Sequence, residues 1–155
     1  MRGYYDILEK LRVTLEANPS VNTVTEGDLL DVDLAKQTIF PLSHIIIQNA
    51  TFQERTITFN MNVLFMDLVD FNKDEPKADI PFRGNNNEQD VLNTMLQAAN
   101  KLWSDLSRGD LYTDKYQISG TPSAEPFVER FDNELAGWDL TLSISIPNTD
   151  ISVCS

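Results

Sequence analysis

The stretch at positions 138–147, WDLTLSISIP, alternates between apolar and polar residues almost without a break. Successive side chains of a β-strand point to opposite faces of the sheet, so this period of two predicts a strand with one buried face and one face open to water. Residues 55–70 repeat the pattern until Leu64 and Met66 make the second face apolar as well. The distal end of that strand is therefore expected to be covered on both sides, by a helix or by a neighbouring subunit.

The rest of the chain divides between further strands and two helices. Extended runs are expected at 21–26, 44–52, 116–119 and 122–131, and residues 28–43 are expected to form a short strand and an irregular approach to the next one. Gly137 is expected to serve a turn that leads into the last strand.

Helical spacing of apolar residues appears twice. It covers 3–17, where Asn18-Pro19 ends the helix, and 87–108, where Asn87 is expected to cap the start and Gly109 the end. The stripe of the second helix consists of Leu92, Met95, Leu96, Ala99, Leu102, Trp103 and Leu106. The order of elements predicts an α+β fold of two layers, a mostly antiparallel sheet with two helices packed on one face, in a single domain that spans 1–155.

The charge balance argues against several classes of partner. The chain has 24 acidic and 12 basic residues, which gives a formal net charge of -12. Such a surface repels nucleic-acid backbones and anionic membranes. Apolar runs such as HIII are far too short to span a bilayer, and residues 1–13 lack the apolar core of a secretory signal. The one cysteine, Cys154, leaves no internal disulfide.

The sequence contains no pattern typical of a catalytic or metal site. His44 is the only histidine, and we expect a strand residue with a satisfied ring. No serine stands in a glycine-flanked elbow. Two acidic clusters match no calcium loop and are interpreted as solvated charge; they consist of Asp28, Asp31 and Asp33, and of Asp67 and Asp70. No catalytic residue, cofactor or metal ligand is therefore assigned.

Four aromatic residues have a structural interpretation. Trp103 and Trp138 are expected to anchor the core. Tyr4 and Tyr5 either pack at the start of the first helix or contact a neighbouring chain.

The order of helix, strand pair, long loop, helix and strand hairpin resembles the tail terminator proteins of long-tailed bacteriophages of the phage-lambda-like type. The segments DLLDVDLAKQTIFPLSHIII, FRGNNNEQDVLNTM and AEPFVERFDNELAGWDLTLSISIPN are also similar to small structural proteins from tailed phages of Bacteroidota hosts. The resemblance covers most of the chain.

The resemblance implies a ring, usually a hexamer, at the head-proximal end of the phage tail tube. The ring ends tube polymerisation and offers a surface to the head connector. It also implies a virion protein that is made in the host cytoplasm, without cofactor or catalysis. Its partners would be sister copies, the tail tube protein and the connector, stopper or portal-side neck proteins, and DNA would pass through the lumen without specific binding.

A ring of this kind needs head-to-tail contacts, and those contacts need groups that an isolated chain leaves exposed. The candidates in irregular segments are Phe40, Leu42, Phe71, Ile80, Phe82 and Arg83. Residues 67–90 carry seven acids against three bases, and like charge would keep passing DNA from adhering. The candidate lumen or loop charges are Asp67, Asp70, Asp74, Glu75 and Asp79.

Three alternatives remain open at this stage. A head–tail adaptor or stopper protein would also form a ring, although adaptors are often mainly helical and the alternating strands argue against that. A small enzyme that uses carboxylates and a metal is a second alternative. A host-derived binding module with no role in the virion is a third.

Overall fold

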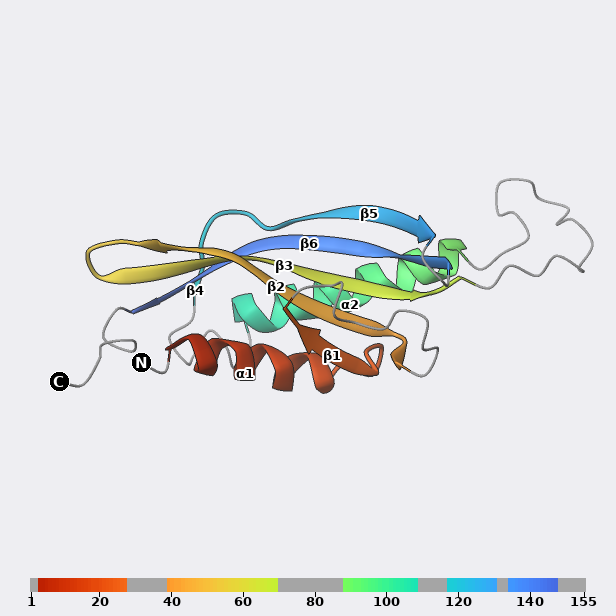
Figure 1. Ribbon diagram of the computed structural model, residues 1–155, viewed down its shortest axis with the longest axis horizontal. Helices are drawn as coiled ribbons and strands as arrows, with labels where there is room; N and C mark the ends of the chain where they lie inside the picture. The colour runs from red at the N-terminus through yellow and green to blue at the C-terminus, as the bar shows by residue number, and fades with distance from the viewer. Residues whose placement is uncertain (1–2, 28–38, 70–87, 109–116, 131–133, 148–155) are drawn as a thin grey trace, which may run out of the picture.

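The computed structural model describes residues 3–27, 39–69, 88–108, 117–130 and 134–147. Two helices, α1 (Gly3–Glu16) and α2 (Glu88–Arg108), pack against a six-stranded sheet (Figure 1). The strands are β1 (Thr23–Glu26), β2 (Leu42–Phe52), β3 (Thr56–Leu68), β4 (Gln117–Ile118), β5 (Ser123–Arg130) and β6 (Glu134–Pro147). The expected α+β fold with a mostly antiparallel sheet is confirmed. A short strand was expected within 28–43, and residues 28–38 of that segment lie outside the described residues, as do the caps expected at Asn87 and Gly109.

The sheet has the order β1-β2-β3-β6, and β4 and β5 both pair with the far side of β6. Only β1 and β2 run parallel; every other described pair is antiparallel. The two edge segments follow each other along β6, because β4 pairs with 144–145 and β5 with 134–141. The link between them contains Gly120, whose φ of 75° favours glycine.

Both helices cover the same face of the sheet, which we call the helix-covered face. The alternation in β6 explains why: Leu140, Leu142, Ile144 and Ile146 are all buried in one cluster with residues of α1 and α2. The indole Nε1 of Trp138 donates to the carbonyl oxygen of Leu92 at 2.8 Å, so β6 is also tied to α2 by a hydrogen bond. Trp138 is thus a core anchor, as expected.

The opposite face, which we call the open face, carries neither α1 nor α2. Near the C-terminal end of β3, however, this face is apolar. Leu64 and Met66 of β3 are buried there in a second cluster with Phe40, Leu42 and Leu135. This confirms that the end of β3 is covered on both sides, by residues of the same chain. It also corrects the expectation that Phe40 and Leu42 lie in an irregular segment open to a neighbour: Leu42 begins β2, and both side chains are buried within the chain.

Two backbone features set the shape of the sheet. The pairing of β2 with β3 shifts between Ile47 and Asn49, so Gln48 is the extra residue of a β-bulge. The sequence suggested that Gly137 serves a turn, but the residue lies inside β6. A Cβ atom there would overlap the carbonyl oxygen of Phe65, so glycine is required because β3 approaches closely.

Candidate functional site

Most residues proposed from the sequence as contacts or lumen charges lie outside the described residues, so these assignments stay predictions. They are Asp70, Phe71, Asp74, Glu75, Asp79, Ile80, Phe82 and Arg83. Asp67 is described and belongs to β3, where its side chain is half-buried and its Oδ1 accepts a hydrogen bond from the backbone N–H of Leu68 at 2.8 Å. Burial raises the pKa of the Asp67 carboxyl. Asp67 is therefore not the solvated loop charge that the sequence suggested.

His44 is fully buried on β2 and makes structural hydrogen bonds. Its Nδ1 lies 2.6 Å from Thr25 Oγ1, and its Nε2 lies 2.8 Å from the carbonyl oxygen of Gly27. The ring ties β2 to β1 and to the turn after it, which confirms the expected satisfied histidine. Within the described segments, no group of three or more His, Cys, Asp or Glu residues is placed to hold a metal ion. No helix in those segments is long and apolar enough to cross a membrane.

The polar part of the open face is a ladder of side-chain hydrogen bonds across β2, β3 and β6. Asn62 Nδ2 donates to Asp139 Oδ1 at 2.7 Å and to Thr141 Oγ1 at 3.0 Å. Asn62 Oδ1 in turn accepts from Gln48 Nε2 at 2.8 Å. Asn60 occupies the same role one step along, with Asn49, Thr51 and Ser143. These amides and hydroxyls bond one another, which fixes the register of the three strands.

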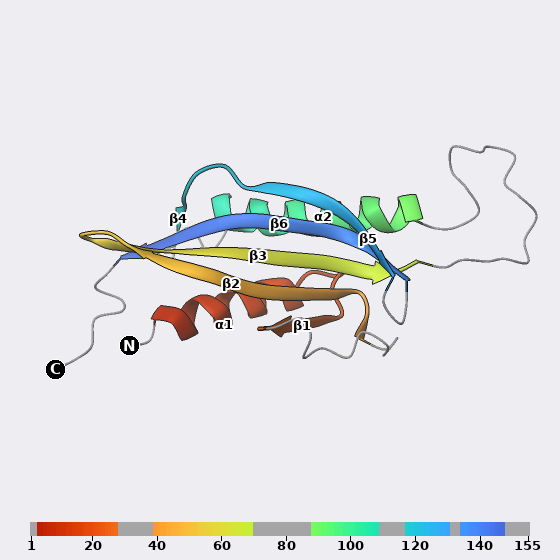
Figure 2. The same cartoon turned by 45° about the horizontal axis from the view of Figure 1, so that its top comes forward.

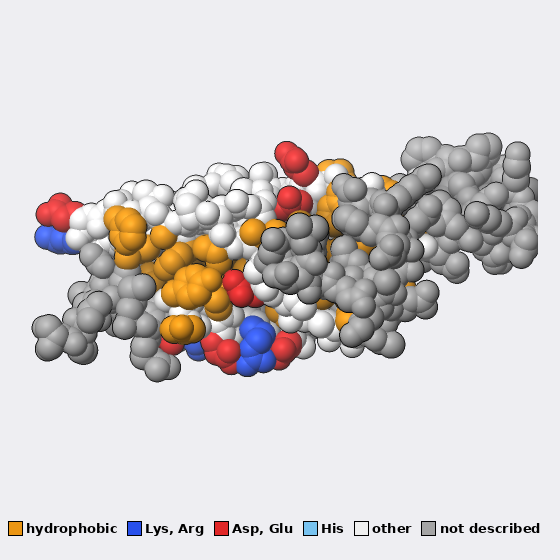
Figure 3. Space-filling model, viewed as in Figure 1, with side chains coloured by type: hydrophobic (Ala, Val, Ile, Leu, Met, Phe, Trp, Pro, Cys, Tyr) orange, Lys and Arg blue, Asp and Glu red, His pale blue; other side chains and the backbone are white. Residues whose placement is uncertain are grey.

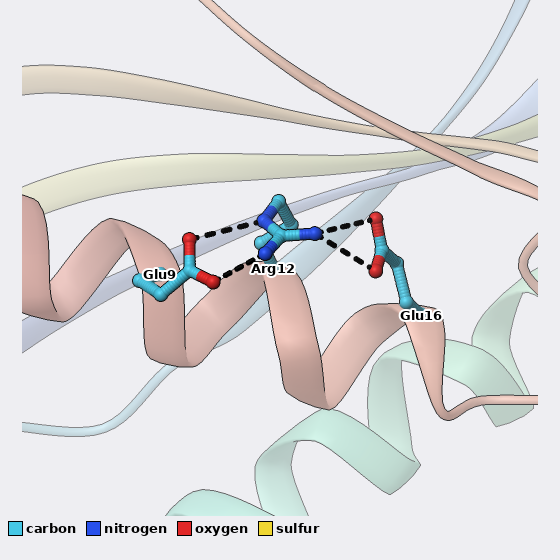
Figure 4. Close-up of polar contacts among 3 residues, drawn as sticks. All are labelled: Glu9, Arg12 and Glu16. Carbon is cyan, nitrogen blue, oxygen red and sulfur yellow. Dashed lines mark hydrogen bonds and ion pairs between the residues drawn. The ribbon is translucent and has the colours of Figure 1, made fainter.

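The outer surface of α1 is a solvated helix face. Arg12 bridges Glu9 and Glu16, one turn before it and one turn after it (Figure 4). The hydrogen bond from Arg12 lowers the pKa of the Glu9 carboxyl. All three side chains are about half exposed, and ion pairs of this kind contribute little to stability. This face supports the helix and is not a candidate site.

Among the described residues, an apolar groove lies between α2 and the β4–β5 link. Its volume is about 340 Å³, and its lining is mostly hydrocarbon. The groove residues are Leu96, Ala99, Asn100, Trp103, Thr121, Pro122, Ser123, Ala124 and Leu140. A second hollow continues it past Trp103 toward Leu106 and Ile118. Figure 2 shows α2 running along the side of the sheet that carries β4 and β5.

Trp103 has a different role from the one expected. Its side chain is 40% exposed and lines the groove, and Leu96, two helical turns before it, is 41% exposed. The predicted stripe of α2 is wider than the face that the sheet buries, because the buried residues run through Met95, Ala98 and Leu102. The width of the apolar stripe could have indicated this from the sequence. A helix with two large apolar residues at the same edge of its stripe has more apolar surface than one sheet covers.

The second distinctive feature is the β2–β3 hairpin, which projects past the ends of both helices in the two views (Figures 1 and 2). Phe52, at the end of β2, is 76% exposed. It pairs with Ile57 and therefore lies on the helix-covered face, in the part that neither helix reaches. The sequence alone did not indicate the exposure of Phe52. A strict alternation along β2 places Phe52 on the other face, because it does not include the bulge at Gln48.

An exposed hydrophobic patch lies next to the hairpin. Hydrophobic side chains gather over the start of α1 and the adjoining part of the hairpin (Figure 3). Tyr5 is 69% exposed, whereas Tyr4 packs against Phe59, with ring centroids 6.1 Å apart. Of the two roles left open for the tyrosines, Tyr4 takes the packing role and Tyr5 is free of the core.

Comparison with protein-family models finds no match, and comparison with curated proteins finds none either.

Proposed function

We propose that this chain is a structural subunit that assembles head-to-tail with copies of itself into a ring. The observation that carries the proposal is that one sheet bears two separate apolar surfaces: the projecting hairpin with Phe52 and the groove beside Trp103. Surfaces of this kind on a soluble chain mark interaction sites. Two unlike surfaces on each copy generate heterologous contacts, which close into a ring when the rotation between copies allows it.

The polar chemistry of the described residues supports a scaffold. The asparagine, threonine and serine side chains on the open face bond each other, and the buried histidine ties two strands together. Groups held in this way stabilise a register. They are not arranged around a pocket in which a substrate could meet an acid and a base.

Within this class we propose the role of a phage tail terminator, in which the ring ends the tail tube and meets the head connector. The sequence order supports it through the resemblance described above. The net charge of -12 supports it as well, because an acidic ring would let DNA pass without adhering. The adaptor or stopper of the neck remains the second candidate, and the sheet-rich fold favours the terminator over it.

Two experiments test the proposal. Native mass spectrometry of the purified chain over a range of concentrations is expected to give one closed oligomer, visible as a ring in negatively stained micrographs. A chain that remains monomeric at every concentration would refute ring formation. Deleting the gene from a virus that encodes it is expected to give overlong or headless tails, and tails of normal length joined to heads would refute the terminator role.

A further inference from the structure

We infer that the tip of the β2–β3 hairpin of one copy, led by Phe52, docks in the groove between α2 and the β4–β5 link of the next copy. This inference rests on the proposed function and specifies its contact. The groove has a volume of about 340 Å³ and is lined mainly by Leu96, Ala99, Trp103, Pro122 and Ala124. An apolar cavity of about 150 Å³ is enough to hold a benzene ring, so the groove has room for one phenylalanine side chain.

The hairpin cannot fill the groove of its own chain. Phe52 pairs with Ile57, which pairs with Ile146 of β6, whereas the groove lies beside Leu140 on the far side of the same strand. The two sites are thus separated by six residues along β6 and by three strand spacings across the sheet. At roughly 3.3 Å per residue and 4.8 Å per strand, this is a separation of about 20–25 Å within one hydrogen-bonded sheet. The occupant that the hairpin tip fits is therefore a groove on another molecule.

The distribution of charge favours a second copy as that other molecule. Each copy carries a net charge of -12, so two copies repel unless they meet through surfaces without excess acid. The groove meets this condition, because Asn100, Thr121 and Ser123 are its only polar lining residues and none is charged. The hairpin tip meets it as well, because Glu54 and Arg55 stand side by side in the turn and cancel. A basic partner would instead favour the acidic surface elsewhere.

A mixing experiment tests the head-to-tail contact. Phe52→Asp removes the apolar tip and keeps the groove, and Trp103→Asp spoils the groove and keeps the tip. Both side chains are substantially exposed, so both variants are expected to fold, and circular dichroism checks this. Each variant alone is expected to associate about 10- to 100-fold more weakly than the wild type, as the loss of one buried aromatic contact implies. Mixed together, they retain one good contact between them and are expected to form a heterodimer that goes no further.

Matched controls separate this contact from general effects of charge and folding. Val13→Asp adds the same charge at another exposed apolar residue, on α1, and is expected to assemble as the wild type does. Asn100→Asp changes the groove without changing its shape and repeats the Trp103 test if Trp103→Asp fails to fold. Sedimentation velocity reports the oligomer in every case.

Photo-crosslinking gives the position of the contact. With p-benzoyl-phenylalanine in place of Phe52, the assembled protein is expected to give an intermolecular crosslink to peptides that contain Trp103 or Pro122. A crosslink within the same chain, or to another surface of a neighbour, would overturn the inference. So would rings formed by Phe52→Asp at wild-type concentrations, a result that leaves the proposed ring intact. A wild type that is monomeric throughout overturns the inference and the proposed function together.

Discussion

Replacing Gly137 by alanine tests the closest approach in the fold. The added Cβ would stand 2.8 Å from the carbonyl carbon of Phe65 and 2.9 Å from the Cα of Met66, and it would overlap the oxygen of Phe65. Carbon atoms normally approach to about 3.5 Å, so the backbones of β3 and β6 would have to separate by at least about 0.7 Å to relieve the carbon contacts, and by more to clear the oxygen. The side chain of Phe65 is fully buried, so no free space is available for that movement.

The cost follows from two terms. Overpacking a well-packed core costs about 1–3 kcal/mol. Stretching one or two ladder hydrogen bonds adds about 1 kcal/mol each. Gly137→Ala is therefore expected to lower the free energy of unfolding by about 2–5 kcal/mol, out of the roughly 8–23 kcal/mol usual for a chain of this length.

Urea unfolding followed by tryptophan fluorescence measures this change. Gly120→Ala is the matched control, because beyond its two chain neighbours the added Cβ would meet nothing within 4 Å, and only the φ of 75° is unfavourable for alanine. That substitution is expected to cost about 1–2 kcal/mol. Should Gly137→Ala cost no more than the control, the close approach of β3 and β6 at this point would be wrong.

Three further substitutions probe burial and charge. Leu142→Asp places a charge in the core under the helices and is expected to unfold the domain, at a cost of several kcal/mol. Its control, Thr141→Asp on the open face, is expected to cost about 1 kcal/mol. A Leu142→Asp protein that is soluble and folded by circular dichroism would contradict the assignment of faces. Ser43 is buried, and its Oγ has no hydrogen-bond partner in the described structure. Ser43→Ala is therefore expected to leave the melting temperature unchanged or to raise it. A fall in the free energy of unfolding of more than about 1 kcal/mol would show that the hydroxyl is hydrogen-bonded. Burial raises the pKa of the Asp67 carboxyl above about 3.9, the value in the unfolded chain, so its ionisation lowers the stability of the fold as pH rises from about 3.9 through the higher folded pKa. Asp67→Asn is therefore expected to stabilise the protein at pH 7, and this gain is expected to vanish below about pH 3.9. A gain in stability that does not depend on pH would refute the reasoning.

The sequence by itself determined the secondary structure and the main core. A period of two along β6 and β3 fixes which residues face the helices, because side chains alternate in any strand whatever packs on it. The helical spacing of α1 and its end at Asn18-Pro19 are local for the same reason. The single histidine was also read correctly, since nothing near it in the sequence offered a partner for catalysis.

The tertiary structure alone decided which apolar residues stay exposed. Leu96 and Trp103 belong to the same stripe as Leu102, yet only the width of the sheet beneath α2 determines where burial stops. Phe40 and Leu42 looked free for a neighbour, and this chain's own β3 and β6 cover them.

The bulge at Gln48 decided the exposure of Phe52 in a similar way. It changes the phase of β2, which places Phe52 on the helix-covered face beyond the reach of either helix. Exposure depends on what lies across from a residue in space. That information belongs to the packing of distant segments and is not contained in the local pattern.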